Sequence, residues 1–151
     1  MNFSKRRNIN RGYRNLWVWK DAIKYYKETN LVLKDFNYRL NRIASNQLAS
    51  VDSIHRNIAE GYCRKSKKEY LRFLSIAKGS IGESVSGWHA YFAADHISNE
   101  VFQSLDALSY KIENGLIKLI KSITKKSYKE WQDDLIIKES NAIYKNSYKN
   151  K

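Results

Sequence analysis

The chain has 151 residues, and its 28 Lys and Arg residues exceed its 15 Asp and Glu residues to give a formal net charge of +13. This length is about that of one domain and is enough to bury a core without a disulfide or a metal. The excess of cations favours a polyanionic partner, because clustered Lys and Arg release condensed counterions from phosphates. A basic, well-solvated surface without such a partner is the alternative.

Proline and cysteine usage indicates the fold class and the compartment. The chain contains no proline, which is typical of long helices, because proline removes a hydrogen-bond donor and clashes inside a helix. Cys63 is the only cysteine, so there is no intrachain disulfide framework and a reducing compartment is favoured. No run of about 18 apolar residues occurs. We therefore expect a cytoplasmic protein with neither a signal peptide nor a membrane span.

Residues 1–14 form the first segment, which contains no acid and almost no side chain to bury. This composition predicts a flexible basic arm. Such an arm either follows phosphates or is simply disordered. Its cations are Lys5, Arg6, Arg7, Arg11 and Arg14.

The first helix is expected over residues 16–35, where apolar residues recur at helical spacing. Trp17 and Trp19 fall on different faces of it, because two residues subtend about 200° on a helix. One of them therefore either meets a partner subunit or stays exposed or half-buried. The apolar side is formed by Leu16, Trp19, Ile23, Tyr26 and Leu33, with Ala22 and Tyr25 beside them.

The second helix is expected over residues 39–62. Asp52 and His55 lie three residues apart, which permits a contact on one face, and without a nucleophile or third ligand we interpret this pair as structural. Polar residues interrupt the apolar stripe and either line a helix interface or point to solvent. The apolar stripe is Ile43, Val51, Ile54 and Ile58, and the interrupting residues are Asn46, Gln47, Ser50 and Ser53.

A corner between the second and third helices carries the densest positive charge. We expect Gly61 to take the left-handed conformation that commonly ends a helix. Ser66 and Glu69 have the spacing of a capping box, in which the hydroxyl and the carboxylate each accept from the other residue's amide. Glu60 lies near a helix C-terminus, where the dipole disfavours a carboxylate, so we expect a basic partner such as Arg64 or Arg72. Asn57 and Glu60 would then fix the corner.

The cations of this corner have no such structural explanation. They form either a solvated helical corner or a docking site for an anionic polymer. Tyr62 and Tyr70 flank them and either pack in the corner or stack on unpaired bases. We call Arg64, Lys65, Lys67, Lys68 and Arg72 the corner cluster.

The third helix is expected over residues 67–94, with apolar spacings of three and four from Tyr70 to Phe92. A second face carries small residues. Because a glycine inside a helix costs about 0.5–1 kcal/mol relative to alanine, Gly79 and Gly82 favour close approach of another helix, within or between subunits. The small residues are Ser75, Gly79, Gly82, Ser86, Ala90 and Ala93.

The fourth helix is expected over residues 99–124, with Ser98 or Asn99 as its N-cap. Its heptad-like apolar seam, which runs from Val101 to Ile123, is the strongest periodic signal in the chain. Residues 126–151 form a C-terminal extension, with a short helix predicted over 128–138 and a frayed basic end.

Four long helices with short connections and no strand signal predict an all-α fold, an up-down-up-down antiparallel four-helix bundle over residues 15–125. Two stretches of this chain resemble the four-helix-bundle family encoded in intervening sequences of bacterial 23S rRNA genes. The first is Tyr13-Arg14-Asn15-Leu16-Trp17-Val18-Trp19-Lys20, and the second runs from Asn57-Ile58-Ala59-Glu60-Gly61-Tyr62 on to Ser80.

The resemblance implies a left-handed bundle that assembles into a ring-like homopentamer. It also implies a relation to the accessory proteins of diversity-generating retroelements, which are basic pentamers that bind nucleic acid and a reverse transcriptase. Three sites depart from the family pattern: His55 replaces a proline, Arg56 replaces a serine, and Leu48 and Ala49 replace an arginine pair. The first departure suggests a straighter second helix, and the last weakens the expectation of a basic face on it.

The sequence gives no support for an enzyme or a cofactor. It has no phosphate-binding glycine loop, and His55, His89 and His96 lack metal-ligand spacing. We therefore expect no catalytic residue, no metal and no cofactor. Two functions remain. One is a non-enzymatic, oligomeric nucleic-acid-binding module, RNA- or ribosome-related, that uses the basic arm and the corner cluster. The other is a protein-interaction scaffold, such as an accessory partner of a reverse transcriptase.

Overall fold

The computed structural model describes residues 9–127, 129 and 130. Over these residues the chain folds into four long helices with no strand, which confirms the predicted all-α bundle. The four helix ranges expected for the bundle begin and end within two residues of the observed helices. The elements are η2 (Ile9–Asn15), α1 (Trp17–Leu33), η3 (Tyr38–Leu40), α2 (Asn41–Cys63), α3 (Lys67–Ala93) and α4 (Asn99–Lys125).

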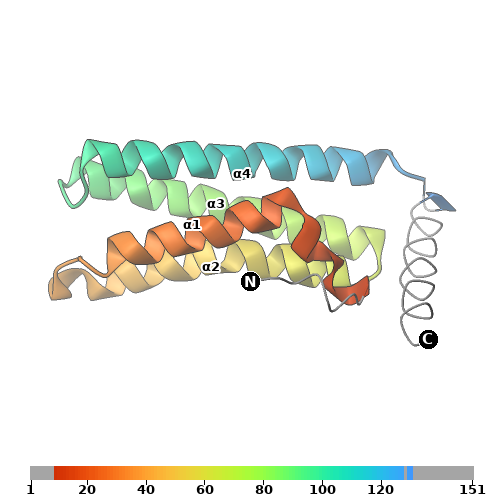
Figure 1. The fold of residues 1–151 in the computed structure, drawn as a ribbon, viewed down its shortest axis with the longest axis horizontal. Coiled ribbons are helices and arrows are strands. Elements are labelled where there is room, and N and C mark those ends of the chain that lie inside the picture. Colours follow the sequence, from red (N-terminus) through yellow and green to blue (C-terminus); the bar gives the residue numbers. More distant parts are fainter. Residues whose placement is uncertain (1–8, 128, 131–151) are drawn as a thin grey trace, which may run out of the picture.

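The four helices lie side by side and contact one another in the order α1, α2, α3, α4 and back to α1 (Figure 1). Between α2 and α3, a residue near the start of one helix contacts a residue near the end of the other. The Tyr91 hydroxyl donates to the carbonyl of Ile43, whereas Ser53 bonds Ser80. The helices α2 and α3 are therefore antiparallel, and α1 and α4, far apart in the sequence, are adjacent.

The core differs from the predicted stripes on two helices. On α1 the buried residues are Val18, Ala22, Tyr25, Thr29 and Leu33, so the buried face is rotated from the expected one. On α3, Tyr91 is buried and Phe92 is exposed. Six polar residues of the described chain are buried together with the apolar residues of the core. The buried polar residues are Thr29, Gln47, Ser50, Ser80, Ser84 and Ser109.

A polar network crosses the core between α1 and α3. The Trp88 indole N–H donates to the Tyr25 hydroxyl at 2.9 Å, and that hydroxyl lies 3.0 Å from the hydroxyl of Ser84. Gln47 on α2 donates to the Ser84 carbonyl at 2.7 Å. Because an unpaired buried polar group is costly, this network restricts how the three helices can pack.

The start of the described chain is more ordered in structure than the predicted arm. Ile9–Asn15 forms a 3-10 helix that packs against the C-terminal part of α2. A Cβ added at Gly12 would lie 2.0 Å from the Tyr62 hydroxyl, and the Tyr13 ring meets the rings of Trp19 and Tyr62 edge-on. The prediction of a flexible arm was therefore wrong for residues 9–14, because the aromatic side chain of Tyr13 has a packing site. Residues 1–8 lie outside the described residues.

Gly61 does not end α2, contrary to the prediction. Among the described residues no glycine has positive φ, and the helix continues to Cys63. The left-handed residue is Lys65, with φ of 56°. Gly61 is buried where α2 and α3 approach closely: an added Cβ would lie 2.8 Å from the Phe73 Cβ and 3.3 Å from the Tyr70 carbonyl oxygen. Packing against α3 therefore requires the glycine.

Replacing Gly61 by alanine is expected to lower the free energy of unfolding by about 1–3 kcal/mol. The Phe73 Cβ and the Tyr70 backbone cannot move aside as a flexible side chain could, so α2 and α3 must separate. This loss outweighs the gain of about 1 kcal/mol in helix propensity. Urea denaturation followed by circular dichroism measures the change, and equal or higher stability of the variant would contradict the close approach.

A capping box follows the end of α4. The Ser127 hydroxyl accepts from the Glu130 amide at 3.2 Å, and the Glu130 carboxylate accepts from the Ser127 amide at 2.7 Å. This is a complete capping box, which the sequence analysis missed although its Ser-x-x-Glu spacing is visible. The short helix predicted over 128–138 lies almost entirely outside the described residues.

Candidate nucleic-acid interface

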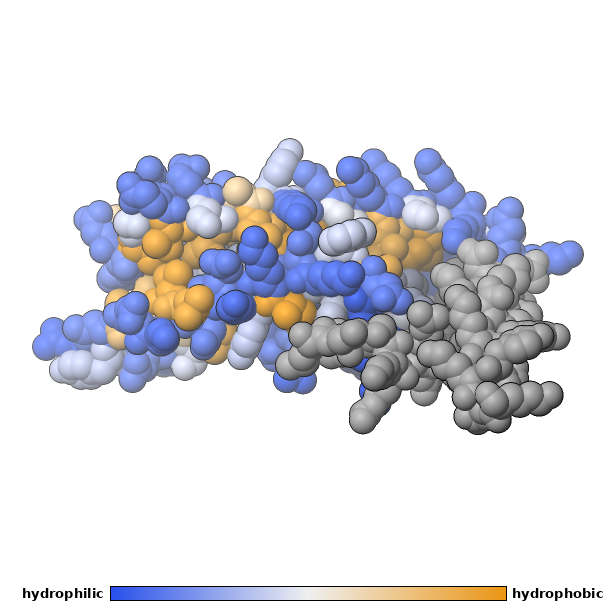
Figure 2. Space-filling model, viewed as in Figure 1, coloured by the Kyte–Doolittle hydropathy of each residue, from blue (hydrophilic) through white to orange (hydrophobic). Residues whose placement is uncertain are grey.

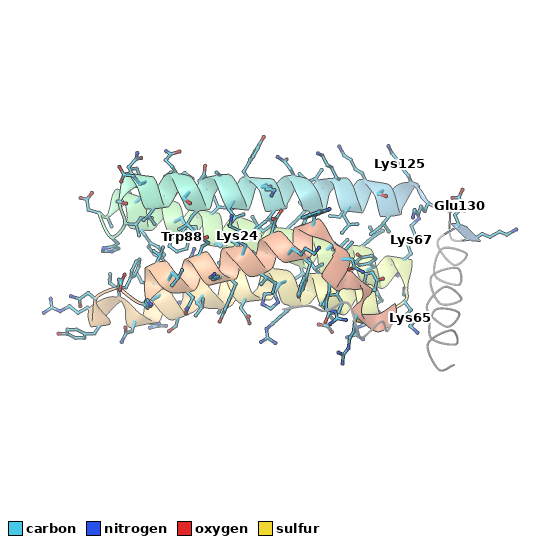
Figure 3. All side chains as sticks on the ribbon, viewed as in Figure 1. Lys24, Lys65, Lys67, Trp88, Lys125 and Glu130 are labelled. Carbon is cyan, nitrogen blue, oxygen red and sulfur yellow. The ribbon has the colours of Figure 1, made fainter. Side chains whose placement is uncertain are left out.

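The corner cluster surrounds the connection between α2 and α3, at one end of the bundle (Figure 3). The Ser66 hydroxyl accepts from the Glu69 amide at 3.3 Å and so caps α3. The Glu69 carboxylate lies 3.8 Å from the Arg72 guanidinium. The corner thus contains both the capped start of α3 and a cation, Arg72, that lies near a carboxylate.

Arg64 and Arg72 are held by the fold on one surface. The Arg64 guanidinium donates to Glu60 at 2.6 Å, which raises the pKa of Arg64 through the hydrogen bond and the opposite charge. It also lies 5.2 Å from the centre of the Phe73 ring, and the Arg72 guanidinium lies 6.0 Å from the same centre. Two cations therefore share one aromatic ring. Both side chains remain more than half exposed, which leaves them accessible to an anion.

Lys67 has a structural role. Its ammonium donates to the backbone carbonyls of Thr124 and Lys126 at 3.3 and 2.5 Å, the last carbonyls of α4. A cation is favourable at a helix C-terminus because the dipole is negative there. The position of Lys67 at the start of α3, unfavourable for α3 alone, is thus explained by α4. Lys67 is therefore a structural cation and not a candidate phosphate contact.

The aromatic residues of the corner are packed. Tyr70 is buried, Tyr62 is half-buried, and their rings meet edge-on with centres 5.9 Å apart. Burial raises the pKa of both phenols above the ordinary value. Of the two readings of these tyrosines, the structure supports packing: the Tyr70 ring is buried and offers no face to a base, and the half-buried Tyr62 ring packs against Tyr70 and Tyr13.

The predicted arm cations are only partly within the described residues. Arg11 and Arg14 lie on η2, where the Arg14 guanidinium donates to the Arg11 carbonyl at 3.2 Å. Since η2 packs on Tyr62, both arginines lie at the same end of the bundle as the corner cluster. Lys5, Arg6 and Arg7 lie outside the described residues.

Asn57 acts within α2 instead of across the corner. Its amide donates to the carbonyl and hydroxyl of Ser53 at 2.7 and 2.8 Å, and Ser53 bonds Ser80 of α3. Asn57 therefore supports the α2–α3 contact indirectly. One turn earlier, His55 lies 3.0 Å from Asp52, at the spacing that the sequence permits.

Other site types find no support in the described part of the chain. No cluster of three or more His, Cys, Asp or Glu side chains within it could hold a metal ion. None of its helices combines the length and the apolar character needed to cross a bilayer.

The comparison with protein-family models gives a match. A family model described as 23S rRNA-intervening sequence protein matches residues 14–118. The matched range begins in η2, includes the corner, and ends within the last part of α4. No curated protein matches the chain.

Proposed function

The chain belongs to the family of 23S rRNA-intervening sequence proteins, and from that premise we propose that it is a non-enzymatic, oligomeric, cytoplasmic protein that binds nucleic acid, RNA in particular. The observation that carries the proposal is the convergence of cations at one end of the bundle. The corner cluster, Arg11 and Arg14 meet there, and within the cluster Arg64 pairs with Glu60 and Arg72 with Glu69. Phosphates bind such a surface mainly by releasing counterions.

The oligomeric part of the proposal rests on the outer face of α3. Its small residues, which the sequence singled out, are all exposed, and a Cβ added at Gly79 or Gly82 would meet no atom within 4 Å. Nothing within the described chain therefore requires these glycines. Ile76 and Phe92 on the same helix are also exposed, whereas Lys78 and Glu83 are its only charged residues from 75 to 93. In a chain of charge +13, such a face suits packing against a second copy.

The test of nucleic-acid binding is a mobility shift with single- and double-stranded RNA and DNA over a range of salt. The paired change Lys65→Glu and Lys68→Glu, which leaves Lys67 in place, is expected to weaken binding roughly 10- to 100-fold near 50 mM salt, because two phosphate contacts become repulsive. The slope of log affinity against log salt should fall by about 0.7–0.9 per lost contact.

The matched control reverses Lys34 and Arg42 to Glu at the opposite end of the bundle, so net charge changes equally. This control should retain most of the affinity. Absence of any shift by the unaltered protein near 50 mM salt would reject the proposal. Recovery of a protein partner that survives nuclease treatment would instead favour the scaffold function.

A further inference from the structure

A second basic surface lies along α1 and α4, outside the corner cluster. From residue 114 to residue 129 the chain contains no acid. Its lysines in α4 recur every three or four residues, so they share one flank of the helix. On α1, lysines recur in the same way. We call Lys20, Lys24, Lys27, Lys111, Lys118, Lys121 and Lys125, all of them exposed, the α1–α4 lysine face.

The fold joins these two rows. Lys111 on α4 lies 3.3 Å from Asp21 on α1, and a Cβ added at Gly115 would lie 3.2 Å from Val18. The start of α1 therefore lies beside the middle of α4. Figure 2 shows hydrophilic side chains along the outer edge of α4, and Figure 3 places Lys125 at the same end of the bundle as Lys65 and Lys67. The lysine face is thus continuous with the corner.

The charges on this face are less neutralised than those at the corner. Among the described residues, the only carboxylate within ion-pair distance of any of the seven lysines is Asp21, which pairs with Lys111. At the corner, by contrast, Arg64 and Arg72 pair with carboxylates and Lys67 is held by backbone carbonyls. A phosphate that binds the lysine face therefore displaces fewer existing interactions.

Trp17 adds an aromatic surface to the face. Its side chain is 76% exposed, and the Lys20 ammonium lies 4.7 Å from the centre of its ring. Core packing does not explain an indole in this position. A base stacks on such a ring only when it is unpaired, and every base can do so. A cation beside the ring is also placed to meet the phosphate of the stacked nucleotide.

We propose that the α1–α4 lysine face and Trp17 form a track for single-stranded RNA, with phosphates on the lysines and an unpaired base on the Trp17 indole. This inference rests on the proposed function and assigns it a surface and a substrate class. The distance from Lys111 to Lys125 along α4 is about 21 Å at 1.5 Å per residue. That length matches roughly six stacked nucleotides at 3.4 Å each.

The test compares an oligouridine of about twelve nucleotides with an RNA duplex of equal length. Replacing Lys118, Lys121 and Lys125 by Gln should weaken oligouridine binding roughly 10- to 100-fold and lower the salt slope by about 2, at 0.7 per single-strand contact. The matched control replaces Lys34, Arg39 and Arg42 by Gln at the far end. Trp17→Ala should weaken oligouridine binding about 5- to 150-fold and leave duplex binding unchanged, and Trp17→Phe should restore part of it.

The outcomes separate the two proposals. If the unaltered protein binds no RNA, the proposed function fails and this inference fails with it. If it binds RNA and the α4 variant binds equally well, only the lysine face is rejected, and a loss with the corner variant would keep the function. If Trp17→Ala weakens the binding of single-stranded and duplex RNA equally, the stacking role is rejected. It is also rejected if this change weakens the binding of neither RNA. Circular dichroism of each variant excludes unfolding as the cause of a loss.

Discussion

Replacing Trp88 by alanine is expected to lower the free energy of unfolding by about 3–5 kcal/mol. The indole is 1% exposed and packs edge-on against Tyr91 at 5.6 Å between ring centres. Its removal leaves a cavity and also takes the N–H donor from the Tyr25 hydroxyl. Since natural domains have only about 5–15 kcal/mol of stability, the variant should unfold at much lower urea concentration, as measured by circular dichroism.

Trp17→Ala is the matched control, because it makes the same chemical change at a side chain that is 76% exposed. It should change the free energy of unfolding by no more than about 0.5 kcal/mol. Trp88→Phe separates packing from hydrogen bonding, since it keeps an aromatic ring and removes the donor. A Trp88→Ala variant as stable as the Trp17 control would show that the core is not organised around this residue.

The helices could be predicted from sequence because each has a strong periodic signal or a cap. The α4 seam includes Leu105, Ile112 and Leu116, all of which are buried. The buried serines could not be predicted from apolar patterns. The hydroxyls of Ser84 and Ser109 donate to carbonyls three residues earlier in their own helices. Because this hydrogen bond is made within the helix, these serines can be buried in the core. A pattern that counts only apolar residues therefore misplaces the buried face.

The corner illustrates which features of a site depend on tertiary structure. The spacing of Ser66 and Glu69 sufficed to locate the start of α3, because capping is local. The role of Lys67 depends on the end of α4, nearly 60 residues later in the chain. Gly61 likewise depends on how closely α3 approaches. Neither contact leaves a signal in the residues near it.

The α1–α4 lysine face was missed for a related reason. Lysines on a predicted helix are ordinarily a solvated face, and those of α1 and α4 are separated by most of the chain. Only the fold shows that the pair of Asp21 and Lys111 brings the two rows together. The small-residue face of α3 is different, because the sequence identified it but left open whether the contact lies within or between subunits. The described fold leaves it exposed, so no contact within the described chain uses it.

Introducing arginine at both Gly79 and Gly82 is expected to convert the oligomer to a folded monomer. Within one described chain an added Cβ at either position meets no atom within 4 Å, and arginine favours a helix over glycine by about 0.8 kcal/mol per residue. The isolated subunit should therefore be as stable as before or more so. In a subunit contact, two long cations cannot occupy the space that the glycines leave, and their burial without partners is costly.

Light scattering after gel filtration measures the mass, and circular dichroism confirms that the helices remain. The control introduces arginine at Ser45 and Ala49, which are exposed small residues four apart on α2, so it adds the same charge to another helix and should leave the mass unchanged. A glycine variant that keeps the oligomeric mass would place the contact elsewhere, and an unaltered protein that is monomeric would remove the reason for these glycines. A shallower salt dependence of RNA binding by the monomeric variant would show that assembly multiplies the phosphate contacts.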